Sequence, residues 1–438
     1  MTSSKSSIVA IVGRANVGKS SLFNSLLGRR QAIVARESGT TRDSLSAKIS
    51  IGKKDFWLVD TAGLKTAEDN FESSIQQQIA QAADAADVIV VVVDKSSSIT
   101  DQDRRVAKMA LKSRKPVVLV INKVDLSAGE IARFERLGIK TSVAVSATQK
   151  RGLNELLQRL DRILPAATIK EAPDRVRVAL LGRPNVGKSS LFNALGKKQQ
   201  ALVSSRAGTT RDINRLVVRY HQREIELLDT AGIRRSGRVE RGVEHFSVLR
   251  SLAAIEMSDI CILLIDASEP AVQLDQKIAG LVKDAGKGLI LVLSKWDSAQ
   301  KDIEGFEQMS RLVTADYPFV PWAPLVFTSS VTGQNVSKIF ELVIDITRQR
   351  QSKIKTSELN RWLRRAVDKH PPAGYKNQSP KLKFIVQETD APLPSFQISG
   401  TQIKYLHWSY RRYLEKSFRA NWPLPGTPIK FWFIDKTA

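Results

Sequence analysis

The sequence has a single cysteine, Cys261, among its 438 residues. A disulfide needs a second cysteine and a thiolate metal site needs several, so both are excluded. Because Cys261 lies in an apolar run, we expect it to pack as a small hydrophobic residue. The four histidines are scattered without the spacing of metal ligands, and we assign them no chemistry.

Long hydrophobic runs are also lacking. The longest, at 88–93 and 260–265, are far shorter than the ~20 residues that a membrane-spanning helix needs. A strand-like run begins by residue 8, which leaves no room for a signal or transit peptide before folded structure. We therefore expect a cytoplasmic protein.

Acidic residues are outnumbered, with 44 Asp and Glu against 68 Lys and Arg, so the net charge is +24. Such a surface concentrates polyanions and binds them in a salt-dependent way. Nucleic acid is the first expected partner class. An acidic membrane is the second, although no basic amphipathic helix with a broad apolar face is present.

A whole domain is written twice in this chain. Residues 11–63 align without a gap on residues 180–232, and 25 of the 53 aligned positions are identical. After each copy, short β-branched runs alternate with helical patterns such as 75–86 and 272–283. This alternation predicts an α/β fold with a mostly parallel sheet and helices on both faces.

We expect four segments along the chain. They are domain 1 (1–165), a linker (166–175), domain 2 (176–350) and a basic C-terminal domain (351–438). The last segment holds 16 Lys and Arg against 6 Asp and Glu, together with four tryptophans that we expect in its core. Its pattern predicts a small α+β domain with helices at 358–369 and 403–418 and strands at 381–387, 395–399 and 429–434.

Both copies contain G-x-x-x-x-G-K-S between an apolar strand and a helix, at 13–20 and 182–189. In such a P-loop the backbone N–H groups wrap phosphates, the lysine reaches the outer phosphates and the serine hydroxyl binds Mg²⁺. The predicted nucleotide-binding residues of the two loops are Gly13, Asn16, Gly18, Lys19, Ser20, Ser21, Gly182, Asn185, Gly187, Lys188, Ser189 and Ser190.

A second motif indicates guanine as the base. Asp125 ends Asn122-Lys123-Val124-Asp125 after a strand, and its carboxylate can accept hydrogen bonds from guanine N1–H and the 2-amino group, which adenine does not offer. Ser146 and Ala147 follow the next strand and are placed to contact the base oxygen. The corresponding residues of the second copy are Ser294, Lys295, Asp297, Ser329 and Ser330.

A third pair of motifs predicts a switch. Asp60 and Asp229 begin D-T-A-G and would hold Mg²⁺ through water, while the N–H groups of Gly63 and Gly232 would meet the γ-phosphate. Thr41 and Thr210, in G-T-T-R-D, can complete the Mg²⁺ coordination only while the γ-phosphate is present. We expect the residues that act in catalysis to be Lys19, Lys188, Thr41, Thr210, Gly63 and Gly232.

This order of motifs resembles the translation-factor-related GTPases, and two such domains before a basic tail resemble the Der (EngA) family over nearly the whole chain. The tail motifs at 359–363, 369–372, 409–413 and 426–429 are similar to that family's KH-like domain. The resemblance implies GTP hydrolysis with Mg²⁺, coupled to maturation of the large ribosomal subunit, with ribosomal RNA as partner. We expect a monomer.

The water-positioning glutamine of many GTPases is missing, because Leu64 and Ile233 follow D-T-A-G. Turnover should therefore be slow. Related enzymes with the same gap imply that Asn16 and Asn185 help to hold a K⁺ ion near the phosphates. The alternative is that each asparagine only braces its loop.

The second copy departs from the pattern at Ser294, where asparagine is usual. Serine is too short to make both carboxamide bonds, to the base and to the P-loop, and losing one costs about 1 kcal/mol of nucleotide affinity. Asp297 still selects guanine. We therefore expect weaker or faster-exchanging nucleotide in domain 2.

The basic residues of the C-terminal domain are either a solvated face or an RNA contact. The candidate phosphate-binding residues lie on one predicted helix and are Arg411, Arg412, Lys416 and Arg419. The tail has no G-x-x-G, so the backbone clamp of ordinary KH domains is absent and RNA would use another surface.

The motifs predict a three-domain GTPase switch that acts in assembly of the large ribosomal subunit. One alternative is a GTP-gated RNA-binding module with incidental hydrolysis. Another is a tRNA-modification GTPase, which should carry a further domain for folate or thiol chemistry that this sequence lacks.

Overall fold

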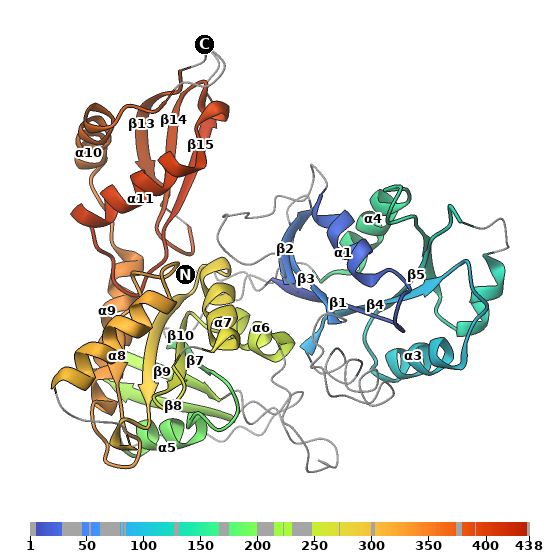
Figure 1. The fold of residues 1–438 in the computed structure, drawn as a ribbon, viewed down its shortest axis with the longest axis horizontal. Helices are drawn as coiled ribbons and strands as arrows, with labels where there is room; N and C mark the ends of the chain where they lie inside the picture. Colours follow the sequence, from blue (N-terminus) through green and yellow to red (C-terminus); the bar gives the residue numbers. More distant parts are fainter. Residues whose placement is uncertain are drawn as a thin grey trace.

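The structure is a computed structural model. It describes residues 6–28, 46–51, 54–61, 79, 82, 85–126, 131–165, 175–198, 214–221, 223–229, 248–270, 272–298, 303–373, 379–389 and 391–435. Figure 1 shows three bodies, with domain 2 in contact with both domain 1 and the C-terminal domain. No described helix is long and apolar enough to cross a membrane.

Domain 1 is built on a six-stranded sheet in the order β2-β3-β1-β4-β5-β6, in which only the β2–β3 pair is antiparallel. β1 and β4 are buried along their whole length, as expected for central strands covered on both faces. The elements are β1 (Ser7–Val12), α1 (Lys19–Leu27), β2 (Ser46–Ile51), β3 (Lys54–Asp60), β4 (Val88–Asp94), α3 (Asp101–Lys112), β5 (Val117–Asn122), η2 (Ala132–Leu137), β6 (Thr141–Ala144) and α4 (Leu153–Ile163).

Domain 2 repeats this architecture, with the sheet order β12-β11-β10-β7-β9-β8 and only β8–β9 antiparallel. The elements are β7 (Arg175–Leu181), α5 (Lys188–Lys198), β8 (Asn214–Tyr220), β9 (Arg223–Asp229), α6 (Val248–Met257), β10 (Ile260–Asp266), α7 (Gln273–Asp284), β11 (Gly288–Ser294), η4 (Trp296–Ser298), α8 (Ile303–Asp316), β12 (Leu325–Phe327) and α9 (Val336–Gln351). The predicted duplicated α/β fold is confirmed.

Two smaller predictions for these domains have different outcomes. The helix expected at 272–283 is α7, whereas most of 75–86 and residues 166–174 of the linker lie outside the described residues. The last predicted linker residue, Arg175, is the first residue of β7. Cys261 is fully buried in β10, and burial raises the pKa of its thiol to about 12. It is therefore a core residue that stays protonated.

The C-terminal domain has a three-stranded sheet in the order β13-β14-β15, with β13–β14 antiparallel and β14–β15 parallel. Leu359 and Trp362 of α10 pack with Phe418 of α11 on one face of this sheet. The elements are α10 (Thr356–Lys369), β13 (Lys381–Gln387), β14 (Ser395–Thr401), η5 (Ile403–Tyr405), α11 (Trp408–Asn421) and β15 (Lys430–Asp435). The α+β prediction is confirmed.

Two predictions for this domain were wrong. The helix expected at 403–418 is divided into η5 and α11, because the chain is extended at Leu406 and His407 and the His407 ring accepts a hydrogen bond from the Ser409 N–H at the start of α11. Trp408 and Trp432 are 48% and 38% exposed, so they are not core residues.

Domain 1 packs against α6 of domain 2 through a buried carboxylate. Glu256 is 2% exposed, and its two oxygens accept hydrogen bonds from the Trp57 indole at 2.6 Å and from the Ser6 N–H at 3.0 Å. Buried residues of both domains form one continuous apolar cluster around this contact. The carboxylate thus joins the two domains inside a low-dielectric interface.

The C-terminal domain is hydrogen-bonded to domain 2 along the backbone. The Leu289 N–H donates to the Gly426 carbonyl at 3.0 Å, and the Gly426 N–H donates to the Trp322 carbonyl at 2.7 Å. Gly426 has φ +65°, and a Cβ there would lie 2.2 Å from Ile346 Cδ1. The close approach of these two domains therefore requires glycine at this position.

Candidate GTP-binding sites

The first P-loop follows β1, which lies between β3 and β4 where the strand order reverses. Open α/β sheets bind ligands at such a point, beyond the carboxyl ends of the strands. Gly13 has φ +153°, and a Cβ on it would lie 2.5 Å from the Val92 carbonyl oxygen. Gly18 is left-handed at φ +91°, and α1 begins at the next residue. The two glycines let the loop turn tightly into the helix N-terminus, which favours anions.

The P-loop lysines point back over their loops. Lys19 Nζ donates to the carbonyls of Gly13 at 2.9 Å and Arg14 at 2.5 Å. In domain 2, Lys188 Nζ makes the same two bonds, to Gly182 at 3.0 Å and Arg183 at 2.5 Å. Each ammonium is thereby held over the cradle in which phosphates would bind.

The structure brings together the two predicted Mg²⁺-binding side chains that it describes in each copy. Ser20 Oγ donates to Asp60 Oδ2 at 2.6 Å, and Ser189 Oγ lies 3.4 Å from Asp229 Oδ2. A hydroxyl beside a carboxylate offers the hard oxygen ligands that suit Mg²⁺, which usually takes few protein ligands together with phosphate oxygens and water. The residues present therefore fit this ion.

The Asn122-Lys123 pair holds the loops of the site together. Asn122 Nδ2 donates to the P-loop carbonyl of Val17 at 2.9 Å, and its Oδ1 accepts from the Ala147 N–H at 3.1 Å. Lys123 Nζ bridges the Asn16 carbonyl at 2.9 Å and Asp94 at 2.6 Å. One dipeptide at the end of β5 thus contacts both the P-loop and the loop after β6.

Asp125 is exposed in the turn that follows β5. A hydrogen bond from Ser146 lowers the pKa of Asp125 and outweighs the opposing effect of desolvation. The carboxylate is therefore ionised at neutral pH, the form in which both of its oxygens can accept hydrogen bonds. Ser146 itself is fully buried, so its hydrogen bond reaches the exposed Asp125 carboxylate from the protein interior.

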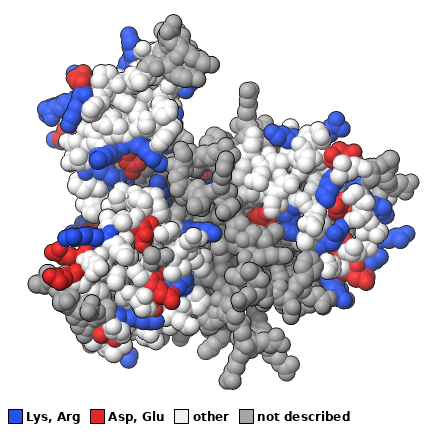
Figure 2. Space-filling model, in the orientation of Figure 1, with Lys and Arg blue, Asp and Glu red and all other residues white. Residues whose placement is uncertain are grey.

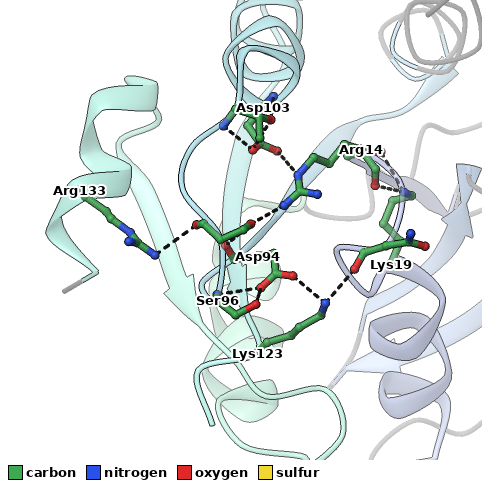
Figure 3. A network of polar contacts seen from close by, with 11 residues as sticks. Arg14, Lys19, Asp94, Ser96, Asp103, Lys123 and Arg133 are labelled. Carbon is green, nitrogen blue, oxygen red and sulfur yellow. Dashed lines mark hydrogen bonds and ion pairs between the residues drawn. The ribbon is translucent and has the colours of Figure 1, made fainter. Parts of the chain in front are cut away.

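A network around Arg14 was not predicted (Figure 3). The guanidinium of Arg14 pairs with Asp103 of α3 at 3.3 Å and donates to Ser97 Oγ at 2.5 Å. Beside it, burial would raise the pKa of Asp94, but hydrogen bonds from Lys123 and Ser96 lower it. These contacts fix the P-loop relative to the segment after β4.

The same arrangement recurs in domain 2. Arg183 pairs with Asp275 of α7 and with Glu269, both at 2.9 Å, and Lys295 pairs with Asp266 at 2.6 Å. The signal was present in the sequence. An arginine follows the first P-loop glycine in both copies, and an acidic residue recurs 172 positions apart at 103 and 275.

Ser294 retains part of what Asn122 does. Its Oγ donates to the P-loop carbonyl of Val186 at 2.7 Å, and it also lies 3.1 Å from the Ile265 carbonyl. In the described part of domain 2, no hydrogen bond joins Ser294 to the Ser329-Ser330 segment. The contact with the P-loop is therefore kept, while the contact with the loop after β12 is not made.

The space over the P-loop glycine differs accordingly. A Cβ on Gly18 would lie 2.3 Å from Asn122 Nδ2, whereas a Cβ on Gly187 would meet nothing within 4 Å. Asp297 is half-buried in η4, directly after Lys295 and Trp296. The four residues Thr41, Thr210, Gly63 and Gly232 lie outside the described residues.

The candidate RNA-contacting residues of α11 are in two environments. Arg411, Arg412 and Lys416 are exposed, with Arg411 4.7 Å from the ring centre of Phe433. Arg419, in contrast, pairs with Glu415 and donates to the carbonyls of Pro423 and Thr427 at 3.2 Å. The guanidinium of Arg419 is thus used inside the protein.

Comparisons with known proteins agree with this geometry. The model of a family described as 50S ribosome-binding GTPase matches residues 8–123 and again 177–295, and the KH-domain-like model of the C-terminal region of EngA bacterial GTPases matches residues 353–433.

Curated relatives match along nearly their whole length. The chain is 41% identical to GTPase Der of Chloroflexus aggregans, with 97% of each chain covered, and 40% identical to GTPase Der of Thermomicrobium roseum, with 98% and 96% covered. It is 37% identical to GTPase Der of Agathobacter rectalis, with 97% of each covered. The chain therefore belongs to the Der family of GTPases, with two GTP-binding domains followed by a KH-like domain.

Proposed function

We propose that this protein hydrolyses GTP slowly in both domains and uses the two nucleotide states to control binding to the large ribosomal subunit during its assembly. The observation that carries the proposal is the duplicated site, in which a P-loop, a serine–aspartate pair and a guanine-selective aspartate occur in both domains. Relatives named as Der GTPases and the match to a 50S ribosome-binding model support it.

Catalysis in this proposal depends on positioning and charge, not on proton transfer by a side chain. Lys19 and Lys188 would move from the loop carbonyls to the phosphates and stabilise the charge that develops on them. Bound Mg²⁺ supplies further positive charge against the β- and γ-phosphates. Ser20 with Asp60, and Ser189 with Asp229, would orient that ion.

The switch itself is assigned to Thr41 and Thr210, with Gly63 and Gly232 at the γ-phosphate. We also assign a K⁺ site to Asn16 and Asn185, both of which have left-handed backbones with φ 63° at the tip of the P-loop. Replacing K⁺ by Na⁺ should then lower the hydrolysis rate. An equal rate in both salts would remove the K⁺ assignment and leave each asparagine as a brace.

Sedimentation of the chain with purified large ribosomal subunits tests the proposed function. We expect binding that is strong with a non-hydrolysable GTP analogue and weak with GDP, by a monomeric protein of the cytoplasm, with Arg411, Arg412 and Lys416 contributing. Sedimentation that is equal in all nucleotide states would contradict the switch. Single-turnover hydrolysis that subunits do not stimulate would favour a GTP-gated binding module in which hydrolysis is incidental.

A further inference from the structure

Domain 1 carries a basic groove that no P-loop residue lines, although it begins at Arg104, directly after the Asp103 that pairs with the P-loop arginine. The groove has a volume of about 490 Å³ and is lined by Arg104, Lys108, Leu111, Lys112, Arg136 and Leu137. The lining residues come from α3 and η2. Figure 1 shows α3 at the lower edge of domain 1, on the side away from the C-terminal domain. Figure 2 shows Lys and Arg side chains along the outer edge of domain 1, interspersed with Asp and Glu.

The cations of the groove form an ordered stripe. Arg104, Lys108 and Lys112 are four residues apart on α3, so they follow one side of the helix at intervals of about 6 Å. Arg136 approaches from η2 across the groove. We call these four residues the α3 stripe.

Three of the four charges are not neutralised within the part of the chain that the structure describes. Arg104 lies 3.9 Å from Asp101, an exposed pair that contributes little. Among the described residues, Lys108, Lys112 and Arg136 have no ion pair, and all three side chains are exposed. The stripe therefore presents unneutralised positive charge to solvent.

The duplicated domain shows that neither the fold nor the nucleotide site requires this charge. Asp103 of α3 and Asp275 of α7 occupy equivalent positions, 172 residues apart, and each pairs with its P-loop arginine. At the same offset, Arg104, Lys108 and Lys112 correspond to Gln276, Gly280 and Asp284. These three helix positions carry a total charge of +3 on α3, whereas the equivalent three positions carry −1 on α7.

The floor of the groove is partly apolar. Leu111 is 43% exposed between the cations, and Leu137 lies beside it at the end of η2. A row of cations beside a small apolar surface matches the phosphates of a nucleic-acid strand together with its less polar ribose or base surface. An acidic protein would supply carboxylates without such a regular spacing.

We propose that the α3 stripe binds the phosphodiester backbone of RNA without reading its sequence, as a second RNA contact besides the C-terminal domain. The inference rests on the proposed function, which makes ribosomal RNA the partner. It adds a contact on domain 1 that moves with that domain, so the RNA would be held at two separate points of the chain.

The test compares two double variants of the full chain. Lys108→Gln with Lys112→Gln removes two charges of the stripe, and Lys277→Gln with Lys338→Gln removes two exposed charges of domain 2 as the matched control. The affinity for purified large-subunit ribosomal RNA is measured at several salt concentrations. Unchanged GDP affinity shows that each variant is folded.

We expect the stripe variant to bind the RNA about tenfold more weakly than the wild type. The slope of log K against log[salt] should also become about 1.5 smaller in magnitude, because each lost phosphate contact reduces that slope by roughly 0.7–0.9. The control should behave as the wild type. A stripe variant with the wild-type slope would overturn the inference and leave the proposed function standing if the wild-type chain still sediments with subunits. A wild-type chain that binds neither RNA nor subunits would overturn both.

Discussion

A single side chain distinguishes the two nucleotide sites most clearly. Asn122 joins the P-loop to the loop after β6, whereas Ser294 reaches the P-loop and the Ile265 carbonyl but, within the described part of domain 2, not the loop after β12. The carboxamide also covers Gly18, while the space above Gly187 is open. Domain 2 should therefore hold its nucleotide in a less constrained site.

Exchanging these residues should exchange the behaviour of the sites. Asn122→Ser should weaken GDP binding in domain 1 by about 1 kcal/mol, or roughly fivefold, because one hydrogen bond is lost. Ser294→Asn should strengthen binding in domain 2 by a similar factor, since open space is available. The rate of release of a fluorescent GDP analogue from each site measures this. Faster release from domain 2 after Ser294→Asn would contradict the explanation.

Asp275 gives a residue-scale prediction about pH. Its side chain is fully buried, its Oδ1 has no hydrogen-bond partner in the described structure, and burial outweighs Arg183 to raise its pKa to about 6. A carboxyl whose pKa is raised on folding stabilises the folded state below its unfolded pKa near 3.8, and that stabilisation is lost as pH rises through 6.

Relative to Asp275→Asn, the wild-type chain should therefore lose about 2 kcal/mol of domain 2 stability between pH 4.5 and pH 7. The melting transition of domain 2 in the two chains, followed at both pH values, measures the difference. If the wild type instead gains stability over this range, the Arg183 ion pair dominates and the pKa is lowered.

At the scale of elements, α6 joins domain 2 to domain 1 in the described part of the chain. It follows D-T-A-G of domain 2 in the sequence, and Glu256 on it is the acceptor for Trp57 and Ser6 of domain 1. A change that moved α6 would therefore also change the contact with domain 1.

Removing this carboxylate should loosen domain 1. Glu256→Ala leaves two buried donors without an acceptor, at a cost of about 3 kcal/mol. We expect hydrogen exchange at the Trp57 indole to accelerate by about 100-fold and the radius of gyration from solution scattering to rise. Glu341→Ala, at an exposed glutamate of α9, is the control. Unchanged exchange in Glu256→Ala would show that the interface does not depend on this residue.

Sequence patterns predicted some of the helices and strands correctly and missed features that depend on local backbone or tertiary packing. The central strands of both GTPase domains were predictable because β-branched runs such as 88–93 are buried on both faces. The break at Leu406 and His407 was not, since the apolar spacing continues across it and only the backbone at the cap changes. Exposure of Trp432 depends on which sheet face is covered, which is a property of tertiary packing.

The site was more predictable than the contacts that support it. Motif residues such as Lys19 and Asp125 are recognisable because phosphate and guanine require those residue types at fixed spacing. Arg14 and Asp103 are far apart in the sequence and meet only because α3 packs beside the P-loop. Similarly, the use of Arg419 inside the protein follows from the packing of α11 near Pro423 and Thr427.

At the scale of the whole molecule, the arrangement is asymmetric. The C-terminal domain is bonded to domain 2 through Gly426, while domain 1 meets domain 2 through Glu256. Positive charge is found on both outer parts, on the α3 stripe and on α11. Under the proposed function, the chain would hold RNA at both ends while nucleotide binding changes the contacts between them.

The proposed switch requires two guanine-specific sites in one chain. Titration calorimetry with GDP and ADP measures this directly, in the wild type and in Asp125→Asn and Asp297→Asn, where an amide donor would face the guanine donors. We predict two GDP and no ADP bound per wild-type chain, and one GDP per chain in each variant. A wild-type chain that binds ADP as tightly as GDP, or that binds only one GDP, would contradict the account.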